Sequence, residues 1–182
     1  VWFGAKGTQH DYSWTLGSYE YQTVVHEIGH ALGLKHPFQG SPRNGTVVDP
    51  SWDSRSFTIM SYSAVAGNSS TYFSFEPTTP MLLDIAAIHA VIPEAHFVSN
   101  TSFHASGTTY TYNAGADYHH TIWDAGGIDT IRYVSSTGGT IDLNQGQGSQ
   151  LGKTVYTQDA NSQNIGAVRN IWIAYDAVIE NA

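Results

Sequence analysis

The stretch "HEIGHALGLKHP", from His26 to Pro37, concentrates side chains that can bind a metal ion and move a proton. His26 and His30 are four residues apart, so on a helix both imidazoles project from one face and can hold the same ion. Glu27 follows His26 directly, and its carboxylate can reach a metal-bound water without taking a coordination position. This arrangement predicts a metal centre with a general base.

A third ligand on the same helix would be badly angled, so the chain must turn back after His30. Gly33 permits that turn because a glycine has no Cβ to oppose a positive φ, and His36 then arrives from a new direction. Three imidazoles with an open fourth position are the ligand set of a catalytic zinc. The alternative is a chance "HExxH" in a helix, which for five specified residues has a probability on the order of 20⁻⁵ per starting position.

The pattern "HExxHxxGxxH" resembles the signature of the metzincin zinc proteases, and Pro37 makes it similar to the serralysin branch of secreted bacterial metalloproteases. "FTIMSYSA", from Phe57, resembles the Met-turn of this family. "TPMLLDIAAIHAVI", from Thr79, resembles the helix that follows it. The resemblance extends, with gaps, from about Trp2 to Ala182.

The resemblance implies a zinc endopeptidase that hydrolyses protein or peptide substrates. Zn²⁺ is expected on His26, His30 and His36, with Tyr62 as an additional, displaceable ligand. Glu27 and Tyr62 are the expected catalytic residues, and Met60 is expected to form an apolar floor beneath the metal. The other six histidines match no motif and are expected to be surface or core residues: His10, His89, His96, His104, His119 and His120.

A second stretch, "WDAGGIDTI" at residues 123–131, suits calcium. Asp124 and Asp129 offer carboxylates, while Gly126 and Gly127 let backbone carbonyls approach a cation. The alternative is a Gly-Gly turn between strands with solvated aspartates. The family resemblance implies a Ca²⁺ site here, at the junction with a β-roll, to which Gly107, Thr109 and Glu180 contribute.

Hydrophobic spacing predicts the elements that position these residues. A helix is expected from Tyr19 to Leu34, ended by Gly33, and a loop from Lys35 to Arg55. The core-facing positions of that helix are predicted to be Val24, Val25, Ile28, Ala31 and Leu32. A second helix is expected to begin with Thr79 as N-cap and Pro80 as first residue and to stop at Pro93. Its apolar stripe would comprise Met81, Ile85, Ile88 and Ile92.

The remainder of the chain is expected to be mainly β. Short β-branched and aromatic runs, "TTYTY", "TIRYV", "TIDL" and "IWIAY", alternate with glycine-rich turns, and a short strand is also expected near Val1–Ala5. The fold class is therefore α+β. A metzincin catalytic domain over residues 1–95, lacking its amino-terminal part, would precede a β-rich region over 96–182 that leads into a calcium-binding β-roll. The boundary is expected at about 93–104.

Composition excludes several classes of function. The formal net charge is −8 and the seven Lys and Arg residues are scattered, so nucleic acid is an unlikely partner. The 182 residues include no cysteine, which excludes disulfides, thiolate zinc sites and a thiol nucleophile. No run of 18 or more apolar residues is present, so no membrane span is expected.

A second functional reading is a non-catalytic, metal-stabilised structural or adhesive module of a larger secreted protein. The chain does not begin with Met, and it is expected to be a processed product or a piece of a larger molecule. The remainder of that polypeptide and a proteinaceous inhibitor are the expected partners besides substrates. Secretion to the extracellular space follows from the resemblance alone.

Overall fold

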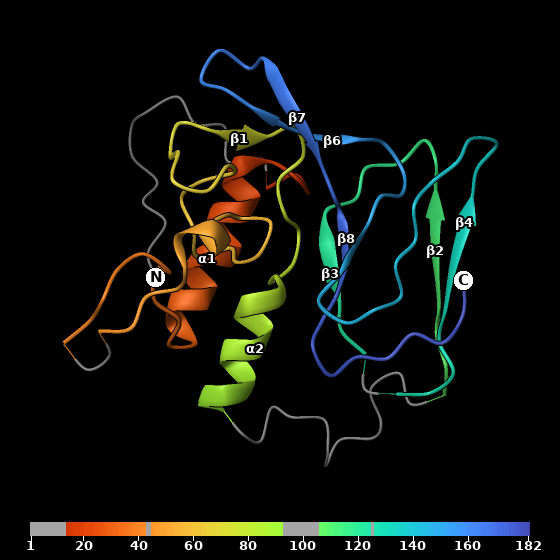
Figure 1. The fold of residues 1–182 in the computed structure, drawn as a ribbon, viewed down its shortest axis with the longest axis horizontal. Coiled ribbons are helices and arrows are strands. Elements are labelled where there is room, and N and C mark those ends of the chain that lie inside the picture. The colour runs from red at the N-terminus through yellow and green to blue at the C-terminus, as the bar shows by residue number, and fades with distance from the viewer. Residues whose placement is uncertain (1–13, 43–44, 93–105, 125) are drawn as a thin grey trace.

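The computed structural model describes residues 14–42, 45–92, 106–124 and 126–182. The strand expected at Val1–Ala5 lies outside these residues, and so does the whole of the expected boundary at 93–104. Two helices, α1 (Tyr19–Ala31) and α2 (Leu82–Val91), lie at one side of the molecule, and most of the strands lie at the other (Figure 1). The fold is therefore mixed α+β, as predicted. Neither helix has the length and apolarity that a membrane span requires.

Helix α1 begins and turns as the sequence predicts. Ser18 caps it by accepting a hydrogen bond from the backbone N–H of Tyr21 at 3.2 Å. At the other end Gly33 has φ of 96°, and its N–H bonds to the carbonyl of His30. The N–H of Leu34 reaches the carbonyl of Gly29, which completes the two-bond glycine cap of a Schellman motif. This cap reverses the chain toward His36.

The predicted core face of α1 is wrong. Ile28 is 51% exposed and Leu32 is 43% exposed, and Ala31 is exposed as well, while Val24 and Val25 are half-buried. The buried residues of the helix are Gln22, His26 and Gly29. They lie on the face that meets the segment around Met60, where hydrogen bonds and a close approach of Gly29 accompany the apolar packing of Val25.

Helix α2 begins two residues later than expected. Its N-cap is Met81, whose N–H bonds to the carboxylate of Asp84 at 2.8 Å. Thr79 instead donates its hydroxyl to the carbonyl of Pro80 and accepts the N–H of Thr121. The Asp84 carboxylate thus accepts the N–H of Met81, which has no partner within the helix, so a threonine cap is not needed.

The strands form three small sheets. The first has the order β1–β6–β7 and is antiparallel, and the second pairs β2 with β4 in parallel. In the third, β8 lies between β3, to which it is parallel, and β5, to which it is antiparallel. Their bounds are β1 Tyr72–Phe73, β2 Thr109–Asn113, β3 His120–Ile122, β4 Thr130–Val134, β5 Gly148–Ser149, β6 Val155–Gln158, β7 Asn164–Val168 and β8 Ile171–Ile173.

Three of the four β runs expected in the second half become strands, namely β2, β4 and β8. The "TIDL" run at Thr140–Leu143 does not, since Thr140 makes only an isolated bridge to Gln150. A short 3-10 helix, η1 (Pro50–Trp52), interrupts the expected loop between Lys35 and Arg55. Asp49 caps this turn through the N–H of Ser51.

Strand β1 and helix α2 connect the helical half to the β half. Tyr72 of β1 pairs with Gln158 of β6, and the N–H of Thr78 bonds to the carbonyl of His119 at 2.8 Å. One hydrophobic cluster contains Ile59, Met60, Met81, Leu82 and Trp172. A larger cluster lies among the strands and includes Ile85 of α2. The division at residue 95 remains a prediction, and across it the two halves share packing.

The stability of this fold is expected to depend on pH through His119. This side chain is fully buried, its Nδ1 meets the carbonyl of Phe75, and its Nε2 has no hydrogen-bond partner in the described structure. Burial lowers the pKa of His119 to about 4. Because the unfolded chain binds this proton more tightly, stability is fully present above pH ~6.5 and is lost as pH falls toward 4, by on the order of 2 to 4 kcal/mol. His119→Gln should flatten this loss in urea titrations of metal-free protein.

Asp84 supplies a control, because its effect on the pH dependence of stability is opposite to that of His119. Burial raises the pKa of Asp84 to about 6, above its ordinary 3.8. Its contribution to stability is present below pH ~4 and is lost as pH rises through 6. Asp84→Asn should therefore steepen the loss of stability on acidification that His119→Gln flattens. Identical slopes for the two variants and the parent would contradict both assignments.

Candidate metal centre

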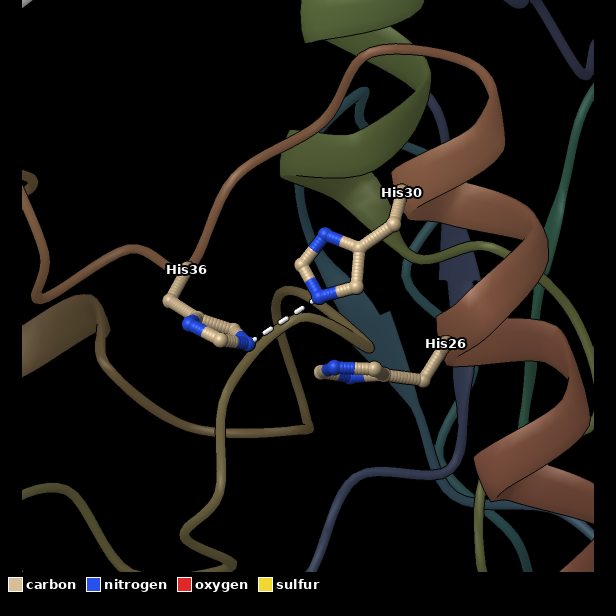
Figure 2. Close-up of side chains that lie close together, drawn as sticks. All are labelled: His26, His30 and His36. Atoms are coloured by element: carbon tan, nitrogen blue, oxygen red, sulfur yellow. Dashed lines mark hydrogen bonds between the residues drawn. The ribbon is translucent and has the colours of Figure 1, made fainter. Parts of the chain in front are cut away.

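Helix α1 and the turn after it bring three imidazoles together (Figure 2). His26 and His30 project from one face of α1 with ring centroids 4.8 Å apart, and His36 faces them from the returning chain. One donor atom from each residue lies within 4.8 Å of the other two. Among the described residues, these three are the group of His, Cys, Asp and Glu side chains whose donor atoms converge in this way.

Each imidazole is oriented by a hydrogen bond on its Nδ1 side. His26 Nδ1 lies 2.8 Å from the carbonyl oxygen of Ile59, and His30 Nδ1 lies 2.9 Å from that of Leu34. His36 Nδ1 lies 3.0 Å from the Oε1 of Gln39. Because a carbonyl oxygen can only accept, Nδ1 of His26 and His30 carries the proton and Nε2 keeps its lone pair. Such partners are those that metal-binding histidines usually have.

The distance between the Nε2 atoms of His30 and His36 is close to that expected across a zinc ion. His30 Nε2 and His36 Nε2 are 3.1 Å apart. A tetrahedral zinc with bonds of 2.0–2.1 Å would separate its nitrogen ligands by about 3.3 Å. Burial lowers the pKa of His26, which outweighs the opposing effect of its hydrogen bond to Ile59 and favours the neutral, ligating form. The donor set therefore suits zinc.

The backbone of Ile59 connects the helix to the Met-turn. Its carbonyl accepts both His26 Nδ1 and the side-chain amide of Gln22, the latter at 3.0 Å. Its N–H donates to Asp84 at 2.8 Å, and the other Asp84 oxygen accepts the hydroxyl of Thr58 at 2.6 Å. Asp84 is 2% exposed, so α2 fixes the turn through a buried carboxylate. The orientation of His26 thus depends on residues from three segments.

Met60 packs beneath the histidines, as predicted. It is 1% exposed and lies against Gly29, where an added Cβ would fall 2.5 Å from its sulfur. Gly29 is placed between His26 and His30 on α1, so helix and turn approach closely under the site. This floor excludes water from one side of the imidazoles.

Tyr62 and Glu27 lie on the open side of the centre. The Tyr62 hydroxyl is 2.9 Å from His36 Nε2, and its side chain is 50% exposed. Glu27 is half-buried and lines a pocket of about 260 Å³ together with His26, Tyr62 and Arg55. A carboxylate and a phenol therefore flank the direction from which a ligand can approach.

The described histidines that were not expected to bind metal lie outside the centre. His119 is buried against Phe73, and His120 Nε2 meets the hydroxyl of Tyr112 at 3.0 Å. His89 is buried at α2, in ring contact with Trp123. His10, His96 and His104 lie outside the described residues.

The predicted calcium residues gather at the turn between β3 and β4. Asp124 accepts the hydroxyl of Tyr110 and the N–H of Gly126, and it is 1% exposed. Asp129 accepts the N–H of Thr108 at 2.6 Å, and its own N–H donates to Glu180 at 2.7 Å.

The glycines of this region have positive φ angles, which few other residues adopt. Gly126 and Gly127 have φ of 133° and 127°. Gly107 also has a positive φ, and an added Cβ there would lie 2.6 Å from the carbonyl oxygen of Ile128. Thr109 pairs with Thr130 in the parallel β2–β4 ladder. The structure brings these segments together, but their carboxylates do not converge as the histidines do.

Sequence reasoning missed Gln22, Arg55, Glu76 and Asp84. Each is a buried polar residue that lies outside the HExxH and Met-turn residues chosen from the sequence. A weak signal existed for Asp84, since an acid in the first turn of a predicted helix is a candidate cap. The pairing of Arg55 with Glu76 has no signature in the linear sequence.

Comparison with known proteins agrees with this geometry. Residues 3–74 match the family model described as metallo-peptidase family M12. Serralysin C of Dickeya chrysanthemi is 34% identical over 188 residues, which cover 91% of this chain and 35% of that protein. Serralysin of Photorhabdus luminescens is 30% identical over 204 residues, which cover 100% of this chain and 38% of that protein. Metalloprotease AprA of Pseudomonas entomophila is 30% identical over 187 residues, which cover 91% of this chain and 35% of that protein.

Over residues 3–74 the chain, with its histidine centre, is similar to metallo-peptidase family M12. Over 91–100% of its length it is similar to serralysins. It spans about a third of the length of the curated relatives it matches.

The contact between Gly29 and Met60 leads to a test of the metal floor. Gly29→Ala adds a Cβ that the buried Met60 sulfur must yield to, and overpacking of this kind costs about 1–3 kcal/mol. We expect a lower free energy of unfolding in urea, and zinc affinity reduced roughly tenfold in competition with a chromogenic chelator. Gly115→Ala is the matched control, because its Cβ would enter open space. Unchanged zinc affinity in Gly29→Ala would contradict a role for this contact.

Proposed function

We propose that this chain is the metal-binding part of a zinc-dependent endopeptidase that hydrolyses peptide bonds of protein substrates. The observation that carries the proposal is the convergence of one ring nitrogen each from His26, His30 and His36, with the Nε2 atoms of His30 and His36 facing each other. Glu27 and Tyr62 beside them offer the remaining groups that peptide hydrolysis needs. The activity of the whole protein is inferred from this piece and from its relatives.

His26, His30 and His36 would hold the zinc ion, which would supply Lewis-acid polarisation and lower the pKa of a water molecule to about 7. The Glu27 carboxylate accepts the proton that the attacking water loses. It then donates this proton to the nitrogen of the leaving amine, so that the carboxylate is regenerated. The Tyr62 hydroxyl donates a hydrogen bond to the oxygen on which negative charge develops.

The rival proposal is a non-catalytic, metal-stabilised module of a larger secreted protein. Such a module needs the histidines and the Met60 floor, and it has no use for Glu27. The half-buried carboxylate beside His26, lining the same pocket as Tyr62, favours the enzyme.

Glu27→Gln is the sharpest test of the enzyme. It preserves the shape of the side chain and removes the base, so the rate of casein cleavage should fall by about 10²–10⁴-fold. Bound zinc, measured by elemental analysis, should stay at the parent level because Glu27 is not a ligand. Glu20→Gln, on the first turn of α1 and outside the pocket, is the control and should keep its activity.

Three outcomes of that assay are decisive. Cleavage by the parent that a zinc chelator abolishes and added zinc restores supports the enzyme. A folded, zinc-loaded parent with no cleavage of unfolded casein supports the structural module. Near-parental turnover by Glu27→Gln would falsify the assignment of the general base.

The β half extends the proposal to calcium and to a β-roll. Strand β4 pairs in parallel with β2, and its Thr130 also forms a parallel bridge with Asn181. Strand β2, strand β4 and the segment at Asn181 therefore run side by side in the same direction. Asp124 and Asp129 are almost fully buried, and ionised carboxylates in such positions are stabilised by a bound cation. Calcium is the cation that carboxylates and backbone carbonyls of this turn would suit. The proposed residues are Asp124, Gly126, Gly127, Asp129, Gly107, Thr109 and Glu180.

Calcium should raise the unfolding temperature of the parent protein. At one hundred times its dissociation constant the added stability would be about 2.7 kcal/mol. Asp124→Asn should abolish the calcium-dependent part of the shift. Asp117→Asn, in an exposed pair with Lys153, should retain it. The same calcium-dependent rise in Asp124→Asn as in the parent would contradict this site.

Three further parts of the proposal rest on the family resemblance. The protein is secreted to the extracellular space, and its partners are protein substrates together with the remainder of its polypeptide. A proteinaceous inhibitor of the metal centre is a further proposed partner.

A further inference from the structure

Arg55 is a buried cation beside the metal centre that the proposed chemistry does not use. It is 1% exposed, although arginine is rarely buried unless it is paired. Its Nε donates to Glu76 Oε2 at 2.9 Å and its Nη2 donates to Glu76 Oε1 at 2.8 Å. The pair is therefore bidentate, the geometry that only a guanidinium offers to a carboxylate.

Glu76 and its neighbours fix the guanidinium in place. Glu76 Oε1 also accepts the N–H of Phe73 at 3.0 Å, and Arg55 Nη2 reaches the carbonyl of Thr71 at 3.2 Å. The rings of Tyr19, Tyr72 and Phe73 lie 5.8–6.0 Å from the guanidinium carbon. This environment leaves little freedom for the cation to move toward a substrate.

The remaining contacts of Arg55 are with the segment that carries Tyr62. Its Nη1 donates to the carbonyl oxygen of Tyr62 at 2.6 Å, and its backbone N–H donates to the carbonyl of Ser63 at 2.8 Å. Two consecutive carbonyls are thereby held by one residue. The Tyr62 side chain itself is half exposed, and its described hydrogen bond is to His36. The direction of the phenol therefore depends on where its backbone is held.

We propose that Arg55, anchored by Glu76, is a positioning residue that holds the backbone of Tyr62 so that the phenol points at the metal centre. The catalytic part of this inference rests on the proposed endopeptidase. Lysine cannot replace Arg55, because an ammonium cannot bind both Glu76 oxygens and the Tyr62 carbonyl in one plane. A purely structural salt bridge would stabilise the fold without acting through Tyr62.

A double-mutant cycle separates these possibilities. Tyr62→Phe removes the phenolic hydroxyl and should lower kcat roughly tenfold or more. Arg55→Lys should lower kcat by a similar factor with little change in KM. In the double variant, Arg55→Lys should lower kcat by less than about a further twofold relative to Tyr62→Phe, because it acts by positioning a hydroxyl that Tyr62→Phe has already removed. Rates are normalised to bound zinc, and Arg132→Lys, at an exposed position of β4, is the matched control.

Fluorine NMR supplies a readout that does not need activity. In protein labelled with 3-fluorotyrosine, Tyr62→Phe identifies one resonance among the eleven tyrosines. Arg55→Lys should shift and broaden that resonance and leave those of tyrosines remote from Arg55, such as Tyr133 of β4, in place. If Arg55→Lys does not fold, Glu76→Gln gives the same test, with a smaller change expected because the acceptor loses its charge.

The outcomes are distinct. A multiplicative loss of kcat in the double variant, or an unshifted Tyr62 resonance in folded Arg55→Lys and Glu76→Gln, overturns the positioning role. Absence of casein cleavage in every protein, the parent included, counts against the endopeptidase, and the resonance then decides the role of Arg55 alone.

Discussion

The backbone hydrogen bonds of one residue, Ile59, fix the position of the metal centre. Its carbonyl orients His26 and accepts the side-chain amide of Gln22 from α1, while its N–H donates to Asp84 of α2. A residue whose N–H and carbonyl are bonded to two different helices cannot change its backbone dihedral angles without breaking one of these contacts. The buried face of α1 is therefore polar, and its packing is set by hydrogen-bond geometry as well as by apolar contact.

This constraint explains which features the sequence predicts well. Spacing within α1 is enough to place His26 and His30 on one face, and Gly33 is enough to predict the reversal that brings in His36. Both depend on local backbone geometry. Met60 and Tyr62 are predicted by resemblance to a known turn, and their observed positions agree with that resemblance.

Other features could not be predicted because they depend on partners far away in the chain. Ile28 and Leu32 satisfy a helical apolar period, yet the face that packs is chosen by Met60 and the Ile59 carbonyl. Thr79 has the composition of a cap, but Asp84 performs that role. Arg55 and Glu76 pair across 21 residues, and no local pattern reports such a contact. The "TIDL" run has strand propensity without a neighbouring strand that completes its pairing.

The cluster of Ile59, Met60, Met81, Leu82 and Trp172 has a consequence for biosynthesis. Trp172 belongs to β8, which is among the last elements of this chain to leave the ribosome. The histidines emerge early, while the apolar surface beneath them stays incomplete until β8 docks. Domains generally fold as units once their residues are available. Metal capture and assembly of the hydrophobic floor are thus separated in time, which delays a competent centre until translation has passed through β8.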